Sequence, residues 1–263
     1  MASDASRSQR LLMLARRLPP TIPQVGSSVL RLATAPTAYA RYLRDRETYR
    51  RLPEAEPLRW RDALPRVHER LPSSPYDSHY FFQDTWAANR LAERRPARHV
   101  DVGSRVDYVG FLTAICEVEF VDIRPLEVTL DRLTCVSGSL LDLPYADHSI
   151  DSLSCLHVAE HVGLGRYGDP LDPAGTRKAA AELQRVLAPG GQLLFSGPVG
   201  RPRVCFNAHR IHSPSAILGM FDELELEEFS GVDDAGSFAR HRRVEELEDS
   251  FYACGMFRLV RRA

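Results

Sequence analysis

The sequence predicts an α/β protein with a seven-stranded, mostly parallel, doubly wound sheet and a helical N-terminal extension. From residue 98 onward, short apolar runs alternate with amphipathic helical patterns, which is the arrangement of β-α-β units. Residues 1–75 are instead rich in Arg, Leu and Pro, and prolines interrupt their helical runs. We therefore expect two parts, a helical extension over 1–75 and an α/β domain over 76–263.

The composition is that of an ordinary globular protein, with 44% hydrophobic and 26% charged residues among 263. A net charge of −1 gives no basic field, so a nucleic-acid partner is not expected. The five cysteines are scattered and odd in number, which favours reduced core residues over a disulfide framework. No apolar run has transmembrane length, and the arginines near the N-terminus make a poor secretory signal. These features predict a cytoplasmic location.

Helical runs in the extension are predicted near Arg7–Arg17, Ser28–Arg51 and Leu58–Leu71. Prolines between them stop or kink each helix, so short helices are expected. We find no catalytic pattern in these runs and expect them to serve as an oligomer contact or a docking surface for a partner.

The segment 76–88 is dense in aromatic and polar residues and leads into a helix that ends near Arg94. Such a run is most often a helix that packs on the sheet. The alternative is a lid over a ligand, in which Tyr80, Gln83 and Trp86 face the ligand.

The central β-α-β unit spans Arg98–Pro125. A strand through Val102 ends at Gly103, a helical pattern follows, and a second strand ends at Asp122. A glycine at the first turn lets a ligand approach the backbone, and an acidic residue that ends the next strand can bind a ribose. Because no glycine recurs before Gly110, the pyrophosphate-binding G-x-G-x-x-G pattern is absent. The spacing predicts a nucleotide-like cofactor without phosphates.

The rest of the chain supplies the remaining elements. Strands are predicted at 133–136, 150–156, 192–196, 224–230 and 254–260, and helices at 174–187 and 214–221. The charge-alternating segment 239–249 is expected to be a solvated helix.

Three motifs in order resemble those of class I S-adenosylmethionine-dependent methyltransferases: Asp101-Val102-Gly103-Ser104, the Pro144–Asp151 stretch before the fourth strand, and Leu187-Ala188-Pro189-Gly190-Gly191-Gln192-Leu193. The resemblance covers about residues 98–230. It implies a Rossmann-like fold and S-adenosylmethionine as the cofactor.

The resemblance also implies roles for individual residues. Asp101 and Gly103 would lie beside the methionine part of the cofactor, Asp122 would accept hydrogen bonds from the ribose, and Asp142 would meet the adenine amino group. The remaining cofactor-binding positions that it implies are Ser104, Ile123, Leu141 and His157.

A narrower resemblance rests on 153–170 and 198–211. These segments are similar to a family of methyltransferase-like proteins of unknown function that are often encoded among bacterial surface-polysaccharide genes. That similarity implies O-methylation of a sugar hydroxyl. Methylation of another small molecule, and a non-catalytic scaffold in a polysaccharide assembly complex, remain alternatives.

Candidate catalytic and acceptor-binding residues follow the fourth and fifth strands, where ligands gather in open parallel sheets. A hydroxyl acceptor needs a base within hydrogen-bond reach. We expect His161 with Glu160, or His209, to supply it. The candidate acceptor-binding residues are Arg166, Tyr167, Asp169, Arg203, Asn207 and Arg210. Loop-bracing ion pairs are the alternative role for the arginines.

No metal ligand is assigned from the sequence. His157–His161 fits the H-x-x-E-H zinc-protease pattern, but that pattern needs a long helix, and Gly163 and Gly165 follow at once. A hard divalent ion on Asp169 or Asp172 stays open, because carboxylates suit such ions.

Overall fold

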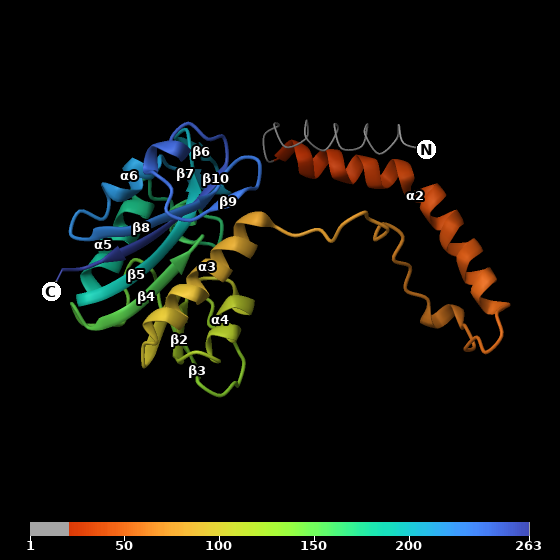
Figure 1. The fold of residues 1–263 in the computed structure, drawn as a ribbon, viewed down its shortest axis with the longest axis horizontal. Coiled ribbons are helices and arrows are strands. Elements are labelled where there is room, and N and C mark those ends of the chain that lie inside the picture. Colours follow the sequence, from red (N-terminus) through yellow and green to blue (C-terminus); the bar gives the residue numbers. More distant parts are fainter. Residues whose placement is uncertain (1–20, 263) are drawn as a thin grey trace. The chain divides into compact units, whose positions relative to one another are not determined.

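The computed structural model describes residues 21–262 and divides the chain into two compact units, Met1–Tyr76 and Asp77–Ala263 (Figure 1). The helical run expected at Arg7–Arg17 lies outside the described residues. Among the described residues, no helix combines the length and the apolar character that crossing a membrane requires.

In the described part of the N-terminal unit, the long helix α2 (Thr21–Arg50) has Pro36 inside it. It confirms the helix expected at 28–51. The helix expected at Leu58–Leu71 is wrong, because only a short 3₁₀ helix, η1 (Trp60–Asp62), forms there. Pro65 lies in the middle of that run, where it removes a helical N–H donor and its ring clashes with the preceding turn.

The second unit is built on an eight-stranded sheet with the order β3-β2-β1-β4-β5-β10-β8-β9. Its strands are β1 (Arg98–Val102), β2 (Glu117–Asp122), β3 (Leu133–Ser137), β4 (Ile150–Leu156), β5 (Leu187–Val199), β8 (Glu225–Val232), β9 (Phe238–Ala239) and β10 (Ala253–Val260). The first five strands are parallel, and β10 lies antiparallel between β5 and β8. The predicted mostly parallel sheet is confirmed. It has eight strands and not seven, because the short β9 pairs with the end of β8.

Helices cover both faces of this sheet (Figure 1). On one face, α3 (Ser78–Arg94) and α4 (Val106–Leu112) pack in a core with Trp86, Leu112 and Met256. On the other face, α5 (Gly175–Val186) and α6 (Pro214–Leu218) pack in a second core. The result is a three-layer α/β arrangement in which strand ends and the loops after them are left to form a site.

Helix α3 contains the aromatic run, and it packs on the sheet. Its N-cap is Asp77, whose carboxylate accepts the backbone N–H groups of His79 and Tyr80. Trp86 is buried and donates to Glu228 Oε1 over 3.0 Å. The packed helix, one of the two alternatives from the sequence, is therefore the one observed.

Two segments differ from their predicted form. The fifth strand begins at Leu187, directly after α5, and so includes the predicted glycine turn, in which Gly190 has a φ of +73°. The charged segment 239–249 forms only the 3₁₀ helix η3 (Val244–Leu247), so the solvated α-helix expected there is wrong. A two-stranded hairpin of β6 (Arg203–Cys205) and β7 (His209–Ile211) lies outside the main sheet.

Candidate functional site

The turn after β1 is built around Gly103, which has a φ of +71°. L-residues with a side chain rarely adopt this conformation. A Cβ at this position would lie 2.9 Å from the Val158 side chain and 3.7 Å from Asp122 Oδ2. A bare residue here therefore keeps the space between the ends of β1, β2 and β4 open.

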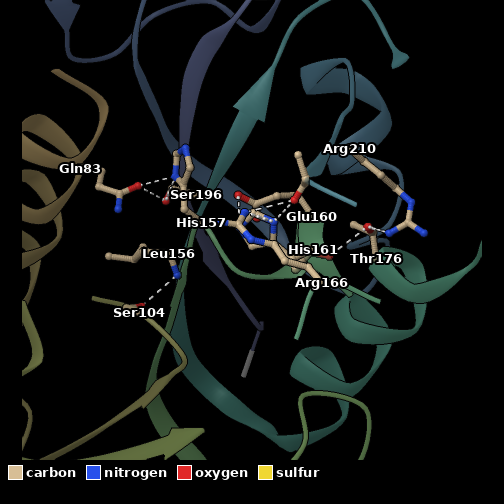
Figure 2. Close-up of polar contacts among 12 residues, drawn as sticks. Gln83, Ser104, Leu156, His157, Glu160, His161, Arg166, Thr176, Ser196 and Arg210 are labelled. Carbon is tan, nitrogen blue, oxygen red and sulfur yellow. Dashed lines mark hydrogen bonds and ion pairs between the residues drawn. The ribbon is translucent and has the colours of Figure 1, made fainter. Parts of the chain in front are cut away.

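Asp101 and Ser104 hold this turn in shape. Asp101 is fully buried, and its carboxylate accepts both the backbone N–H and the hydroxyl of Ser104, over 3.0 and 2.7 Å. The Ser104 hydroxyl in turn accepts the backbone N–H of Leu156, which ties the turn to the end of β4 (Figure 2). Burial raises the pKa of Asp101 to about 6, against the opposing effect of the hydroxyl groups of Ser154 and Ser104. Asp101 and Ser104, both predicted to bind the cofactor, thus stabilise the turn without lining the cavity.

A cavity of about 310 Å³ opens beside the turn, at the carboxyl ends of the parallel strands. Eight of the residues predicted for the site are among those that line it: Gly103, Asp122, Ile123, Leu141, His157, His161, Tyr167 and Asp169. Its size is in the range of small-molecule sites. Asp122 accepts the backbone N–H of Arg124 through Oδ1 over 2.7 Å. The sequence prediction therefore selected residues from four separate segments that the fold brings together.

Other predicted residues do not line this cavity. Asp101 and Ser104 lie behind the turn, and Asp142 is exposed in the loop after β3. The rest of this group are Glu160, Arg166, Arg203, Asn207, His209 and Arg210. Neither Tyr80, Gln83 nor Trp86, the positions of the alternative lid, is among the lining residues.

Several other residues that line the cavity could not be recognised as site residues from the sequence. They include Val121, Arg124, Gly138, Leu140 and Val158. Their side chains are mostly apolar, and an apolar residue in a loop is indistinguishable by type from an ordinary core residue. The order of the strands in the sheet is what places them at one cavity.

His161 and Glu160 lie together in the short 3₁₀ helix η2 (Ala159–His161) after β4. His161 Nδ1 donates to the Ala208 carbonyl over 2.5 Å, which leaves Nε2 without a proton. Nε2 lies 3.7 Å from Glu160 Oε1 and can accept a hydrogen bond from Arg166 Nη1 over 3.4 Å (Figure 2). Burial lowers the pKa of His161 to about 4, so its ring is neutral at neutral pH.

Glu160 is buried, and its Oε2 has no hydrogen-bond partner among the described residues. Burial raises its pKa to about 8, so the carboxyl is protonated at neutral pH. It also lines a small hollow between α5 and β5, away from the cavity at Gly103. The predicted pair is therefore close in space, but the imidazole alone faces the cavity.

His209 lies farther from the cavity, with its ring 6.5 Å from the ring of His161 and 5.3 Å from that of Tyr252. Its Nε2 is buried and has no partner among the described residues, and burial lowers its pKa. This histidine adjoins the His161 side of the site without lining the cavity.

Most of the predicted acceptor-binding residues hold the loops in place. Arg210 is buried and donates to the carbonyls of Val162 and Asp172 over 2.5 and 2.8 Å. Arg203 donates to the Phe251 carbonyl over 2.6 Å. Asp169 accepts the backbone N–H groups of Gly163 and Tyr167, among others. The exposed Asn207 occupies the turn between β6 and β7 with a φ of +63°.

Tyr167 differs from these, because its ring lies at the cavity between two cations. The guanidinium of Arg124 lies 4.5 Å from the centre of the ring, and that of Arg166 lies 5.1 Å from it. All three side chains are exposed. An anionic or ring-shaped ligand can meet this group without displacing a buried contact.

The zinc-protease alternative fails on geometry. The H-x-x-E-H pattern requires one long helix, and η2 ends at His161 after three residues. Of the two carboxylates considered for a hard ion, Asp169 binds backbone N–H groups and Asp172 binds Lys178 Nζ over 2.7 Å. Neither belongs to a metal-competent cluster among the described residues.

Comparisons with known proteins place this geometry in a fold class. The chain resembles a putative sarcosine dimethylglycine methyltransferase from Galdieria sulphuraria, with a TM-score of 0.51, 16% identity, and coverage of 70% of this chain and 86% of that one. It also resembles the N-methyltransferase NodS from Bradyrhizobium japonicum, with a TM-score of 0.50, 15% identity, and coverage of 71% and 98%. At these identities the likeness concerns the fold alone.

A third similar structure is a geranyl diphosphate methyltransferase in complex with GPP and sinefungin, with a TM-score of 0.50, 14% identity, and coverage of 69% of this chain and 78% of that one. The fold is therefore that of the class I methyltransferases, as the sequence motifs predict. Its strand order and the position of its cavity agree with the ligand site expected of a doubly wound sheet.

A sequence-family model described as Caenorhabditis protein of unknown function, DUF268, matches residues 131–250, less than half of the chain. No curated protein matches the chain. The description of the family gives no link to bacterial polysaccharide genes.

Proposed function

We propose that this protein is an S-adenosylmethionine-dependent methyltransferase whose cofactor occupies the cavity beside Gly103. The observation that carries the proposal is the cavity itself, because a glycine with positive φ and the carboxylate of Asp122 line it together at the carboxyl ends of β1 and β2. The carboxylate suits the ribose hydroxyls. Asp101 fits the cofactor indirectly, because it holds the turn that leaves the space free.

The cofactor would supply an electrophilic methyl group on a sulfonium, which is already a good leaving group. The chain must position the acceptor about 3 Å from the methyl carbon and remove the acceptor's proton. His161 is suited to the second task, since its Nε2 is unprotonated and its ring lines the cavity. His209 is the second candidate; its ring lies 6.5 Å from that of His161, but it does not line the cavity.

We further propose that the acceptor atom is a hydroxyl oxygen of a sugar, as in surface-polysaccharide synthesis. Support comes from the exposed ring of Tyr167 at the cavity, on which a sugar ring can stack. The adjacent guanidinium groups of Arg124 and Arg166 can bind a phosphate or carboxylate that the sugar carries. The loss of Tyr167 should then weaken acceptor binding more than cofactor binding.

A methyl-transfer assay with sugar and non-sugar hydroxyl acceptors tests this proposal. His161→Ala should lower methyl release by about 10²- to 10⁴-fold, the usual contribution of a general base, while cofactor binding is retained. His241→Asn is the matched control, because His241 is exposed, is not a cavity-lining residue, and has a left-handed conformation that Asn accepts. Equal activity of the wild type and His161→Ala would exclude His161 as the base. Turnover of non-sugar acceptors alone would exclude the sugar.

A further inference from the structure

Three side chains of metal-binding type meet on the α3 side of the sheet, outside the catalytic pair. They are His79 in the first turn of α3, His157 after β4, and Cys254 in β10. One ligand atom from each lies within 4.8 Å of the other two. Because the three residues come from elements far apart in the chain, only the fold brings them together.

The hydrogen bonds of His157 leave one ring nitrogen available. Its Nδ1 lies 2.6 Å from Gln83 Oε1, and the amide nitrogen of Gln83 donates to Asp84 Oδ1 over 3.1 Å. That second bond fixes the amide oxygen toward His157, so Nδ1 carries the proton and donates it. The Nε2 lone pair is then free, and it has no partner among the described residues although the side chain is only 9% exposed.

The direction of the His157 ring separates it from the catalytic pair. Figure 2 shows the ring turned toward Gln83 and Ser196, on the opposite side from Glu160 and His161. The Ser196 hydroxyl also donates to Gln83 Oε1 over 2.6 Å, which holds this amide oxygen in place as the acceptor for His157. A carbonyl oxygen that receives the second N–H of an imidazole is the usual support of a metal-binding histidine.

The other two side chains lie beside His157. The ring of His79 lies 5.8 Å from that of His157 and stacks at 5.0 Å on that of Tyr252. The Cys254 thiol is fully buried, and its closest polar contact is the Gly255 carbonyl at 4.0 Å, a weak interaction.

We propose that His79, His157 and Cys254 bind one divalent transition-metal ion of the zinc class, with an open fourth position. Two imidazoles and one thiolate form a donor set of borderline softness, which suits zinc and not calcium or magnesium. Ligand atoms around a tetrahedral zinc ion are roughly 3.3 to 3.7 Å apart, so the side chains need to close by about 1 Å on binding. The Cys254 thiol loses its proton to solvent as the metal–sulfur bond forms.

The bound ion would fasten the first turn of α3 to the ends of β4 and β10. His157 also lines the cavity proposed for the cofactor, but the test of the metal site needs neither cofactor nor acceptor. It adds a metal site where the sequence indicated none.

Cobalt(II) titration of the full-length, metal-free protein tests the proposal. The expected result is one ion bound per chain, a thiolate-to-cobalt charge-transfer band, and displacement of cobalt by zinc. Cys254→Ser should abolish the band. Cys205→Ser is the control and should keep it, because Cys205 lies in β6, outside the cluster. Zinc should also raise the melting temperature of the wild type by several degrees, since it binds the folded state alone.

His79→Ala keeps the test decisive if Cys254→Ser does not fold, because His79 is only partly buried near a helix start. This variant should bind cobalt at least tenfold more weakly and retain the thiolate band at saturation. The proposal is overturned if the wild type binds no cobalt, or if the band and the affinity are unchanged in both variants, which would mean an adventitious ion only.

Discussion

Gly103 is the position at which the addition of one carbon atom should affect the proposed site most. A methyl group on residue 103 would lie 2.9 Å from the Val158 side chain, and a residue other than glycine would have to adopt a φ of +71°. Left-handed backbone costs an L-residue about 1–2 kcal/mol. The same methyl group enters the space beside Asp122. A stability cost and a binding cost are therefore expected from one substitution.

Gly103→Ala should lower the free energy of unfolding by about 1–2 kcal/mol and weaken cofactor binding, as measured by urea denaturation and calorimetry. Gly110→Ala is the matched control, because nothing lies within 4 Å of its added Cβ and it sits inside α4. That change should be neutral or stabilising by up to about 1 kcal/mol. Equal effects of the two substitutions would argue against a special role for Gly103.

Glu160 gives a second residue-scale prediction, for the dependence of stability on pH. Its folded-state pKa is about 8, above the ordinary value of 4.5. The unfolded chain therefore ionises first, and the stabilising contribution is fully present below pH 4.5 and is lost as pH rises through about 8. Below pH 6.5 the lowered pKa of His161 acts in the opposite direction, so the diagnostic window is pH 6.5 to 8.

In that window Glu160→Gln should remove a decline of about 1.4 kcal/mol per pH unit in the free energy of unfolding. Urea denaturation of the wild type and the variant at a series of pH values measures this difference. A wild-type slope that survives the substitution would show that another group titrates there.

At the scale of elements, a buried ion pair fastens α3 to the sheet. Arg90 Nη1 lies 2.6 Å from Glu228 Oε2 in β8, and the two side chains are 2% and 4% exposed. Hydrogen bonds from Trp86 and Ser230 to Glu228, together with Arg90, hold the pKa of this carboxyl at about 2, against the opposing effect of burial. The carboxylate thus stays charged, and removal of Arg90 leaves it buried beside the more distant Arg240, whose Nε lies 3.5 Å from Oε1.

Arg90→Leu should therefore lower the free energy of unfolding by about 3–5 kcal/mol. Arg94→Leu on the same helix is the control, because Arg94 is exposed and its hydrogen bond within residues 21–262 is to the Gly190 carbonyl. We expect it to cost less than about 1 kcal/mol. Thermal unfolding of both variants would contradict the account if their losses were alike.

The elements also show which parts of the fold the sequence could predict. The β-α-β unit at 98–125 was predictable because its strands are short apolar runs and its turn needs a glycine. The run at 58–71 misled because apolar spacing suggested a helix while Pro65 forbade one. The two-residue strand β9 was missed because so short an element has no periodicity to detect.

For the molecule as a whole, the candidate site was predictable only in part. Gly103, Asp122 and His161 stand at strand ends, where parallel topology gathers ligands, so order along the chain sufficed. The His79, His157 and Cys254 cluster depends on where α3 packs and on the antiparallel insertion of β10. Local pattern carries no information about that packing. Arg203 and Arg210 have the residue type of ligand-binding groups, but their carbonyl partners are visible only in the fold.

The central claim is that the cavity at Gly103 and Asp122 binds S-adenosylmethionine, and isothermal titration calorimetry of the full-length chain tests it most directly. We expect saturable binding at one site per chain and a ten- to hundredfold loss of affinity in Asp122→Ala, the equivalent of one or two charged hydrogen bonds. Asp107→Ala, which removes an exposed carboxylate paired with Arg105, should bind as the wild type does. The absence of binding by the wild type, or equal affinities for both variants, would contradict the claim.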